Sequence, residues 1–246
     1  MRTGGIDIGS RTTKLVVIED GRIVESQVVD TGTEPLLRTQ ELISRTRLDR
    51  LVATGYGRHL LRERLGIPAI TEIRAHAVGA QQLFPGCRTV IDIGGQDSKV
   101  IQLDNGRQVK FEMNDRCAAG TGRFLEVMAT TLGYTLSEFG LAALRAESAA
   151  VINSMCTVFS ESEVVSLIAK GVARDSIALG LHESIVNRIL ALAGRVGVEL
   201  PLVLCGGVAR NPCILALLEK KLTTRPLVPE EPQIVGALGA ALIATD

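Results

Sequence analysis

One segment of this sequence occurs twice, and the duplication constrains the fold more than any other feature. Residues 6–24 read IDIGSRTTKLVVIEDGRIV, and residues 91–109 read IDIGGQDSKVIQLDNGRQV. The copies align without a gap, with identical pairs that include Asp7/Asp92, Gly9/Gly94, Lys14/Lys99 and Gly21/Gly106. This spacing is too long for a solenoid repeat and matches half of a domain. The sequence therefore predicts two similar halves.

Each copy reads as an apolar strand that ends near an Asp, a turn that contains Gly, and a second strand. Two such units can face each other across a cleft, each presenting a carboxylate and a bare backbone turn. Glycine lets backbone N–H groups approach phosphate oxygens, and carboxylates hold Mg²⁺ through its waters. A single copy would be an ordinary hairpin, but the duplication favours a site for a nucleoside triphosphate and its metal ion.

Composition narrows the classes of partner. The chain has 246 residues, with 27 Lys and Arg against 27 Asp and Glu, and 3% of its residues are aromatic. A net charge of zero and few aromatic residues argue against nucleic-acid binding, which needs phosphate neutralisation and base stacking. No stretch reaches the ~20 consecutive apolar residues that span a bilayer, and no signal peptide is recognised. We expect a cytoplasmic protein without a membrane segment.

Strands alternate with helices, which predicts an α/β architecture. Because the second copy begins after Phe84-Pro85-Gly86, we divide the chain into a first half, 1–84, and a second half, 85–246. The last helix, within 233–244, carries small residues and is expected to pack back on the first half. Strands are expected at 3–8, 13–18, 22–29, 49–53, 89–92, 98–102, 108–113 and 200–204. Helices are expected at 34–46, 58–65, 73–83, 121–132, 136–148, 161–170, 176–196 and 212–221.

The two turns supply the candidate residues for phosphate and metal. Asp7 and Asp92 would order the water shell of Mg²⁺, and either Gln96 or Asp97 would orient the attacking water, since phosphoryl transfer depends on positioning and charge stabilisation. The remaining candidate ligands of the phosphates are Gly9, Ser10, Thr12, Thr13, Lys14, Gly94 and Gly95. Neither turn is a P-loop or a GxGxxG fingerprint, because a strand rather than a helix follows each one.

A third element follows the apolar strand at 200–204. Gly206 and Gly207 lack side chains where a flat adenosine could lie against the backbone, and a helix is expected to begin at Pro212, a favoured first-turn position. We place Asn211 in the same nucleotide site. Lys170, near the end of the helix at 161–170, is a further candidate for the adenine or the ribose.

These three elements, in this order, resemble the actin-like and sugar-kinase ATPase superfamily. The resemblance implies two similar ribonuclease-H-like halves that hinge over ATP. It also implies that Asp7 and Asp92 form the acidic pair around Mg²⁺. The tail at 233–244 resembles the second of the superfamily's two interdomain helices, and the first is expected to start at Gly120-Thr121-Gly122.

Two of the five cysteines stand apart. Cys117 and Cys156 lie in polar stretches ahead of expected helices, and a helix N-terminus favours the thiolate. We interpret Cys87, Cys205 and Cys213 as packing residues. A four-iron cluster needs four ligands, so two thiolates per chain would require a two-fold dimer to supply the others. The chemistry alone leaves the alternative of two buried free cysteines open.

The flanking sequences narrow the family. NDRCAAGTGRFLE (114–126), CTVFSESEVVSLIAKG (156–171), ATGYGR (53–58) and EIRAHAVGA (72–80) resemble the ATP-dependent activators of 2-hydroxyacyl-CoA dehydratases and the related benzoyl-CoA reductase ATPase subunits. Ser160 departs from that pattern, where Ala is expected. The resemblance implies a homodimer that holds one 4Fe–4S cluster through Cys117 and Cys156. It further implies an ATPase that takes an electron from ferredoxin or flavodoxin and passes it to an iron–sulfur dehydratase or reductase.

Two other functions remain open. A metabolite kinase of the same superfamily would need an acceptor pocket with an acidic base, and no clear insertion offers one. A nucleotide-switched scaffold would assemble without iron. Among the other polar residues, the three histidines, His59, His76 and His182, are expected to be structural, since their spacing fits no metal site. Glu161 and Glu163 are expected in the first turn of a helix, as capping residues.

Overall fold

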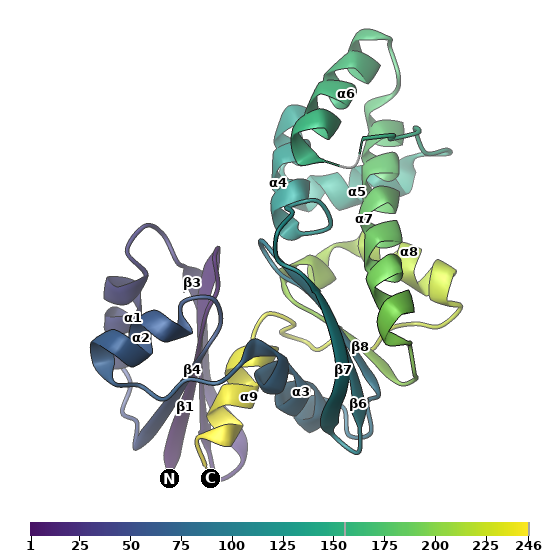
Figure 1. Cartoon of the computed structure of the whole chain (residues 1–246). Coiled ribbons are helices and arrows are strands. Elements are labelled where there is room, and N and C mark those ends of the chain that lie inside the picture. Colours follow the sequence, from purple (N-terminus) through teal and green to yellow (C-terminus); the bar gives the residue numbers. More distant parts are fainter. Residues whose placement is uncertain (155, 246) are drawn as a thin grey trace.

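The computed structural model describes residues 1–154 and 156–245, which form two similar halves joined by a pair of helices (Figure 1). Each half is built on a four-stranded sheet, and the two sheets have equivalent strand orders, β3-β2-β1-β4 and β7-β6-β5-β8. The first sheet comprises β1 (Arg2–Ile8), β2 (Thr12–Glu19), β3 (Arg22–Asp30) and β4 (Arg50–Thr54). The second comprises β5 (Thr89–Ile93), β6 (Ser98–Asp104), β7 (Arg107–Asn114) and β8 (Leu202–Cys205). The duplication in the sequence is therefore a duplication of topology.

Strand pairing repeats the same register in both sheets. The first strand of each sheet pairs antiparallel with the second, which places Asp7 opposite Lys14 and Asp92 opposite Lys99. It also pairs in parallel with the fourth strand, β4 or β8. Every residue of β5 is buried, as expected for a central strand covered on both faces. The identical Asp and Lys of the two copies thus occupy equivalent positions.

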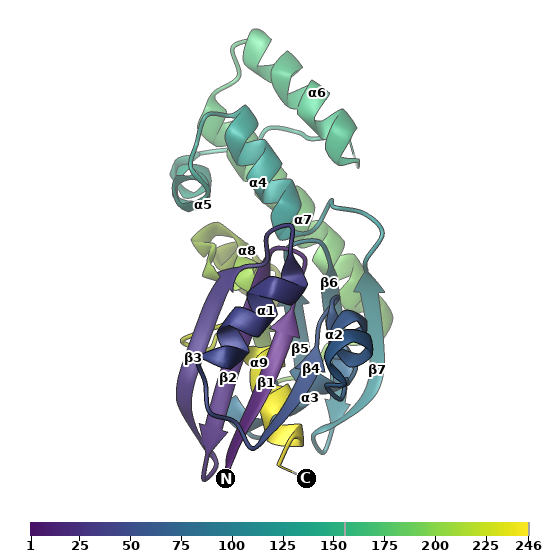
Figure 2. The same ribbon diagram turned by 90° about the vertical axis from the view of Figure 1, so that its left-hand side faces the viewer.

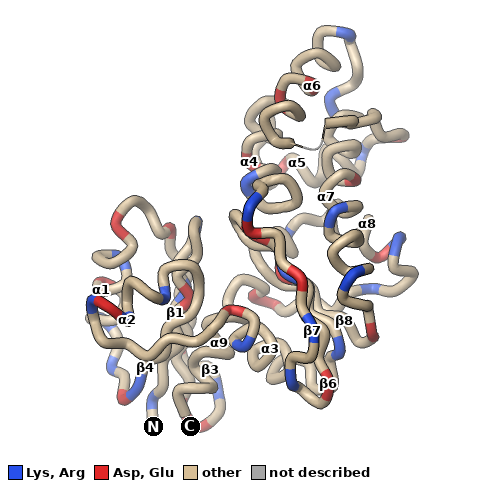
Figure 3. The backbone as a smooth tube through the Cα atoms, viewed as in Figure 1, with Lys and Arg blue, Asp and Glu red and all other residues tan. Residues whose placement is uncertain are grey.

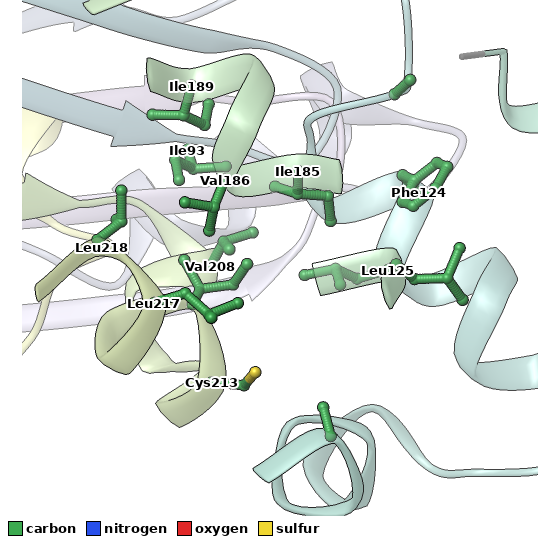
Figure 4. Close-up of a cluster of buried hydrophobic side chains, with 14 of the residues drawn as sticks. Ile93, Phe124, Leu125, Ile185, Val186, Ile189, Val208, Cys213, Leu217 and Leu218 are labelled. Carbon is green, nitrogen blue, oxygen red and sulfur yellow. The ribbon is translucent and has the colours of Figure 1, made fainter. Parts of the chain in front are cut away.

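The helices enlarge the second half far more than the first. The first half carries only α1 (Pro35–Ser44) and α2 (Arg58–Leu65) beside its sheet. The second half carries α4 (Gly122–Thr131), α5 (Leu136–Arg145), α6 (Thr157–Ala169), α7 (Arg174–Val196) and α8 (Pro212–Leu222), with a short 3₁₀ helix, η1 (Gly207–Arg210). The largest buried cluster lies here, where side chains of α7 such as Ile185 and Ile189 lie near Ile93 of β5 and Phe124 of α4 (Figure 4).

Two helices cross between the sheets, α3 (Glu72–Leu83) and α9 (Val235–Ile243). Glycines make this crossing close, since a Cβ on Gly239 would lie 1.8 Å from the carbonyl oxygen of Ala75, and one on Gly79 would lie 2.0 Å from that of Val235. α9 packs on the first sheet, where a Cβ on Gly5 would lie 2.0 Å from the carbonyl oxygen of Ala237. α3 contributes to the buried cluster of the second sheet. Each helix therefore packs on the sheet of the half to which it does not belong in sequence (Figure 2).

This arrangement corrects one expectation. The first interdomain helix does not start at Gly120-Thr121-Gly122, because α4, which begins there, packs inside the core of the second half. The helix that crosses α9 is α3. We propose that the chain divides at residue 84, immediately after α3, and that the two halves hinge at the α3–α9 crossing.

Two helices differ from the sequence reading in further respects. α6 begins at Thr157 rather than at 161, so Glu161 and Glu163 lie beyond its first turn. α7 has 23 residues and contains an 18-residue window with a mean hydropathy of 1.2, so it is long and apolar enough to cross a membrane by length and composition, which the sequence analysis did not identify. In the structure 56% of that apolar window is buried, and α7 is a core helix (Figure 4).

Candidate functional site

The two predicted phosphate turns face each other where the halves meet. Asp7 and Asp92 lie at the ends of β1 and β5 and are 6% and 4% exposed. A Cβ on Gly95 would lie 2.5 Å from Cγ of Arg11 and 3.4 Å from Oγ of Ser10, so the second turn touches the first through a bare backbone. The structure therefore brings together the two Asp residues and the turns that follow them.

Each Asp is held by the Lys of its own repeat. Lys14 Nζ donates to Asp7 Oδ2 at 3.1 Å, and Lys99 Nζ donates to Asp92 Oδ2 at 3.3 Å. Lys99 also lies 2.8 Å from Asp97 Oδ2 and 2.8 Å from Glu72 Oε2. Burial lowers the pKa of Lys99, but these three carboxylates raise it well above its ordinary value. The sequence analysis listed Lys14 and omitted Lys99, although the repeat aligns the two.

The two candidates for orienting water differ in their surroundings. Burial raises the pKa of Asp97 and the charge of Lys99 opposes this, with a net rise. Its side chain is engaged by Lys99 and packs on its own turn, since a Cβ on Gly94 would lie 2.6 Å from Asp97 Oδ1. Gln96, in contrast, is exposed on the turn. The structure thus leaves Gln96 with the greater access to solvent and ligand.

His76 is a site residue that the sequence analysis assigned to structure. It comes from α3, and its Nε2 lies 3.4 Å from Asp92 Oδ1 while its Nδ1 bonds the carbonyl oxygen of Glu72 at 2.9 Å. Burial lowers the pKa of His76, but the charge and hydrogen bond of Asp92 raise it to about 9. Burial conversely raises the pKa of Asp92, and the charges of His76 and Lys99 bring it below its ordinary range. The sequence feature that could have identified His76 as a site residue is the family motif EIRAHAVGA, which contains both Glu72 and His76.

A third buried group completes this cluster. Cys205 Sγ donates to Asp92 Oδ1 at 3.7 Å, and the ligand atoms of His76, Asp92 and Cys205 all lie within 4.8 Å of one another. Lys99 already binds the same carboxylate, and His76 is protonated below its pKa of about 9, so its imidazole offers no free nitrogen to a metal ion at this trio. Burial raises the pKa of Cys205 well above that of a free thiol. Cys205 is therefore a neutral packing and hydrogen-bonding group.

The glycine after β8 has a counterpart after β4 that the sequence analysis missed. Gly206 has φ 84° and Gly55 has φ 87°, values that favour glycine. A Cβ on Gly206 would lie 2.7 Å from Asp92 Oδ1, and one on Gly55 would lie 2.3 Å from Asp7 Oδ1. Gly206 is thus required because it packs against Asp92 at the second turn, and not because it offers a backbone surface to adenosine. Gly207, which is exposed, remains the glycine that can face adenosine.

Two other predicted ligands, Thr13 and Asn211, already have hydrogen-bond partners within the chain, and a third, Lys170, lies in the helical region. The hydroxyl of Thr13 pairs with that of Thr31 at 3.0 Å inside the first half. Asn211 caps α8, because its Oδ1 accepts from two backbone N–H groups of the first turn, and its Nδ2 contacts His182 at 3.0 Å. Lys170 is the C-cap of α6, and Figure 1 shows α6 at the end of the helical region that is farthest from the sheets. Its contact with the adenine or the ribose stays a prediction.

The start of α4 is attached to the phosphate turns. The N–H of Gly122 donates to the carbonyl oxygen of Gly94 at 2.8 Å, and that of Arg123 donates to that of Gly95 at 2.8 Å. From the first turn, Arg11 Nε donates to Glu126 Oε1 of α4 at 3.0 Å. Charged residues of both signs are otherwise mixed over the two halves (Figure 3). A movement of either turn would therefore be transmitted to α4.

The two candidate cluster cysteines lie next to helices of the second half. Cys156 is the N-cap of α6 and is exposed. Cys117 is half-buried in the loop between β7 and α4, where Nδ2 of Asn114 donates to its carbonyl oxygen at 2.9 Å. Thr121 is the N-cap of α4, so Cys117 lies in the loop just ahead of that helix, as expected. Figures 1 and 2 both place the start of α6 beside the β7–α4 loop.

Cys117 and Cys156 could supply two of the four ligands that a four-iron cluster needs. Within residues 1–154 and 156–245, the one group of three or more potential ligands is His76, Asp92 and Cys205, so neither Cys117 nor Cys156 belongs to a site complete within this chain. Cys87, Cys205 and Cys213 are buried, as predicted for packing residues. Burial raises the pKa of Cys87 to about 11 and that of Cys213 to about 12. The two accessible thiols are the ones that fit a site shared between chains.

Comparison with known proteins agrees with this geometry. Residues 5–244 match the BadF/BadG/BcrA/BcrD ATPase family. The activator of lactoyl-CoA dehydratase from Anaerotignum propionicum is 45% identical, covering 99% of this chain and 97% of its own. The crystal structure of component A of (R)-2-hydroxyglutaryl-CoA dehydratase from Acidaminococcus fermentans has a TM-score of 0.93 at 40% identity, covering 99% and 97%. The activator of 2-hydroxyisocaproyl-CoA dehydratase from Clostridium difficile, solved with bound ADPNP, has a TM-score of 0.88 at 40% identity, covering 99% and 94%.

Proposed function

Because this chain belongs to the BadF/BadG/BcrA/BcrD ATPase family, we propose that it is an ATP-hydrolysing activator of a partner dehydratase or reductase. It passes a low-potential electron to that partner, which acts on a CoA thioester. The observation that carries the proposal is the attachment of α4 to both phosphate turns, next to the loop that holds Cys117. Relatives named as dehydratase activators and a benzoyl-CoA reductase subunit support it.

The nucleotide site is formed by the two turns. Asp7 and Asp92 hold Mg²⁺ through its waters, and the metal ion neutralises charge on the phosphates when bound. Backbone groups of Gly9, Gly94 and Gly95 bind the phosphates, with the Asp97 side chain packed against Gly94 and that of Arg11 against Gly95. Lys14, Ser10 and Thr12 add donors from the first turn. Gly207 faces adenosine, and Gln96 orients the attacking water because Asp97 is held by Lys99.

The cluster site is shared by two copies of the chain. Cys117 and Cys156 of each subunit ligate one 4Fe–4S cluster, which stores and releases one electron when bound. The accessibility of these two thiols, and the absence of a third ligand beside them in the part of the chain that the structure describes, support this assignment. Ferredoxin or flavodoxin supplies the electron, and the partner iron–sulfur enzyme accepts it. We expect the whole system in the cytoplasm.

Coupling follows from the hydrogen bonds at the start of α4. ATP makes different contacts with the open and closed arrangements of the two turns, which is the requirement for a ligand to shift such an equilibrium. When the turns move, the Gly94 and Gly95 carbonyls carry α4 and the Cys117 loop with them. The geometry around the cluster, and with it the surface offered to the partner, changes with the nucleotide.

The metabolite kinase is not favoured, because the named relatives of similar length are dehydratase activators and a subunit of benzoyl-CoA reductase. A kinase would release a phosphorylated metabolite, whereas an activator releases free phosphate and reduces its partner. A nucleotide-switched scaffold would assemble without iron. Product analysis and iron content therefore separate all three functions.

The decisive experiment is purification under anaerobic conditions with iron and sulfide analysis, ATPase assay and absorbance spectra. We expect half a cluster per chain, and loss of iron in Cys117→Ser and Cys156→Ser with unchanged far-UV circular dichroism. Cys87→Ser is the matched control, because Cys87 is buried beside Gln81 and should leave the iron content unchanged. A wild-type protein that binds ATP but holds no iron would refute the proposal.

A further inference from the structure

The hinge helix α3 carries two side chains into the ATP site. We propose that Glu72 and His76 are positioning residues of the ATPase reaction, which tie the second phosphate turn to α3 and, through Arg58, to the Gly55 turn of the first half. α3 thereby responds to the contents of the ATP site directly, in addition to the route through α4. The inference rests on the proposed function only in placing ATP at the two turns.

Glu72 lies between the halves and binds a cation from each. Its Oε2 lies 2.8 Å from Lys99 Nζ of the second sheet, and its Oε1 lies 3.7 Å from Nη1 of Arg58 in the first half. The Lys99 side chain is 2% exposed and that of Glu72 is 18% exposed, so this contact is shielded from water. Asp92 and Asp97 also bind Lys99, so Glu72 adds to that lysine a contact that comes from α3.

His76 follows Glu72 by one helical turn on the same face of α3. Its Nδ1 is fixed by the carbonyl oxygen of Glu72, which aims Nε2 at Asp92. Gly236 of α9 provides the space, since a Cβ there would lie 2.9 Å from Cε1 of His76 and 3.4 Å from Oδ2 of Asp7. His76 thus lies next to both acids of the site, at the point where α3 and α9 meet.

Arg58 extends the connection to the first half. Its Nη1 donates to the carbonyl oxygen of Gly55 at 3.0 Å, and Gly55 packs directly on Asp7. A continuous set of contacts then runs from Asp7 through Gly55, Arg58 and Glu72 to Lys99, and Lys99 bonds Asp92. The first turn of α3 is the midpoint of this set. A shift of either Asp7 or Asp92 would therefore be transmitted to α3.

The repeat itself argues that this network does more than neutralise Lys99. Lys14 occupies the equivalent position in the first half, and within the described residues its ion pairs involve Asp7 alone. One carboxylate is therefore enough to hold such a lysine in this fold. Lys99 has two more, and one of them comes from the helix that links the halves. One of the contacts that Lys99 has and Lys14 lacks is therefore that with Glu72 of α3, the helix that links the halves.

The test compares Glu72→Gln, which keeps the shape and removes the charge, with Glu199→Gln. Glu199 pairs with Arg88 beside the start of β5, remote from the turns, and is the matched control. Loss of a residue that orients a site ligand costs about 10–100-fold in activity. We expect Glu72→Gln to lower kcat by that factor with little change in KM for ATP, and to lose the ATP-induced hydrogen-exchange protection of α3. Glu199→Gln should keep both.

Further variants make the result specific. Glu72→Asp retains the charge and should recover part of kcat. In a double-mutant cycle, Glu72→Gln with Arg58→Gln should be no worse than Glu72→Gln alone, because both interrupt one connection. Independent, multiplying losses would overturn the role of Arg58. If Glu72→Gln does not fold, His76→Gln is measured in the same assays.

The outcomes separate this inference from the proposed function. If the wild type hydrolyses ATP and Glu72→Gln has a lower melting temperature but the same kcat and the same protection of α3, then Glu72 only stabilises the fold and the inference is wrong. If the wild type does not bind ATP at all, the proposed function fails and takes the inference with it. The wild-type assay distinguishes the two cases before any variant is measured.

Discussion

The crossing of α3 and α9 allows a sharp test through Gly239→Ala. A methyl group at this position would lie 1.8 Å from the carbonyl oxygen of Ala75 and 2.9 Å from the backbone nitrogen of Gly79, whereas ordinary contacts begin at 3.4 Å. Both obstacles are backbone atoms of α3, so no side-chain rotation relieves them. The two helices must move apart by more than an ångström, and the sheets that they carry must follow.

The expected magnitude comes from two opposing effects. Extra methylene groups in a packed core cost about 1–3 kcal/mol, and rigid backbone on the other side argues for the upper part of that range. Ala gains about 1 kcal/mol over Gly in a helix interior through propensity. We therefore expect a net destabilisation of about 1–2 kcal/mol. We also expect weaker ATP binding, because separating α3 from α9 also shifts His76 and Gly236 at the acids.

Urea denaturation followed by far-UV circular dichroism measures the change in the free energy of unfolding. Gly194→Ala is the matched control, since Gly194 lies in α7, is exposed, and a Cβ there would have no neighbour within 4 Å. Only the propensity effect acts in the control, so it should be stabilised by about 0.5–1 kcal/mol. If Gly239→Ala is stabilised as much as the control, the close crossing described here does not exist in solution.

Two further predictions concern ionisation. Burial raises the pKa of Glu163, but hydrogen bonds from Asn153 and Ser154 outweigh it and lower the pKa from 4.5 to about 2. The stabilisation is therefore present above pH 4.5 and lost as pH falls from 4.5 towards 2. Glu163→Gln should be less stable than the wild type in urea at pH 7, and the difference should vanish near pH 2; a constant difference would contradict the assignment. Asp92→Asn should lower the pKa of His76 from about 9 to below 6.5, because burial then acts with less opposition. NMR titration of the imidazole measures this, and an unchanged value would show that Asp92 is not its main partner.

The duplicated strands allowed the two sheets and their turns to be predicted. Identical Asp, Gly and Lys residues recur at a constant spacing, and this identity implies that β1 with β2 and β5 with β6 share one register, which the structure shows. The α/β alternation and most helix positions also follow from local patterns. Family resemblance supplied the ATPase activity and the interpretation of Cys117 and Cys156, which composition and spacing left open.

Other parts of the site depend on contacts between segments that are distant in the sequence. His76 and Glu72 read as ordinary residues of an amphipathic helix, and only the packing of α3 against the second sheet brings them to Asp92 and Lys99. Asn211 was expected at the nucleotide, but its side chain caps α8, a role that is visible only once the start of that helix is placed.

The sequence by itself determined that there are two equivalent halves, each with an Asp and a Lys flanking a glycine turn. That information is local, because strand pairing and turn geometry depend on residues close in the chain. The small residues of the last helix and the family resemblance already indicated α9 as one helix between the halves, and the tertiary structure alone identified α3 as the other. α3 and α9 cross because Gly79 and Gly239 permit backbone contact, and such a contact has no periodic signature in the sequence. The same crossing delivers His76 to the acidic pair, so the coupling of hinge and site is a property of the packed molecule.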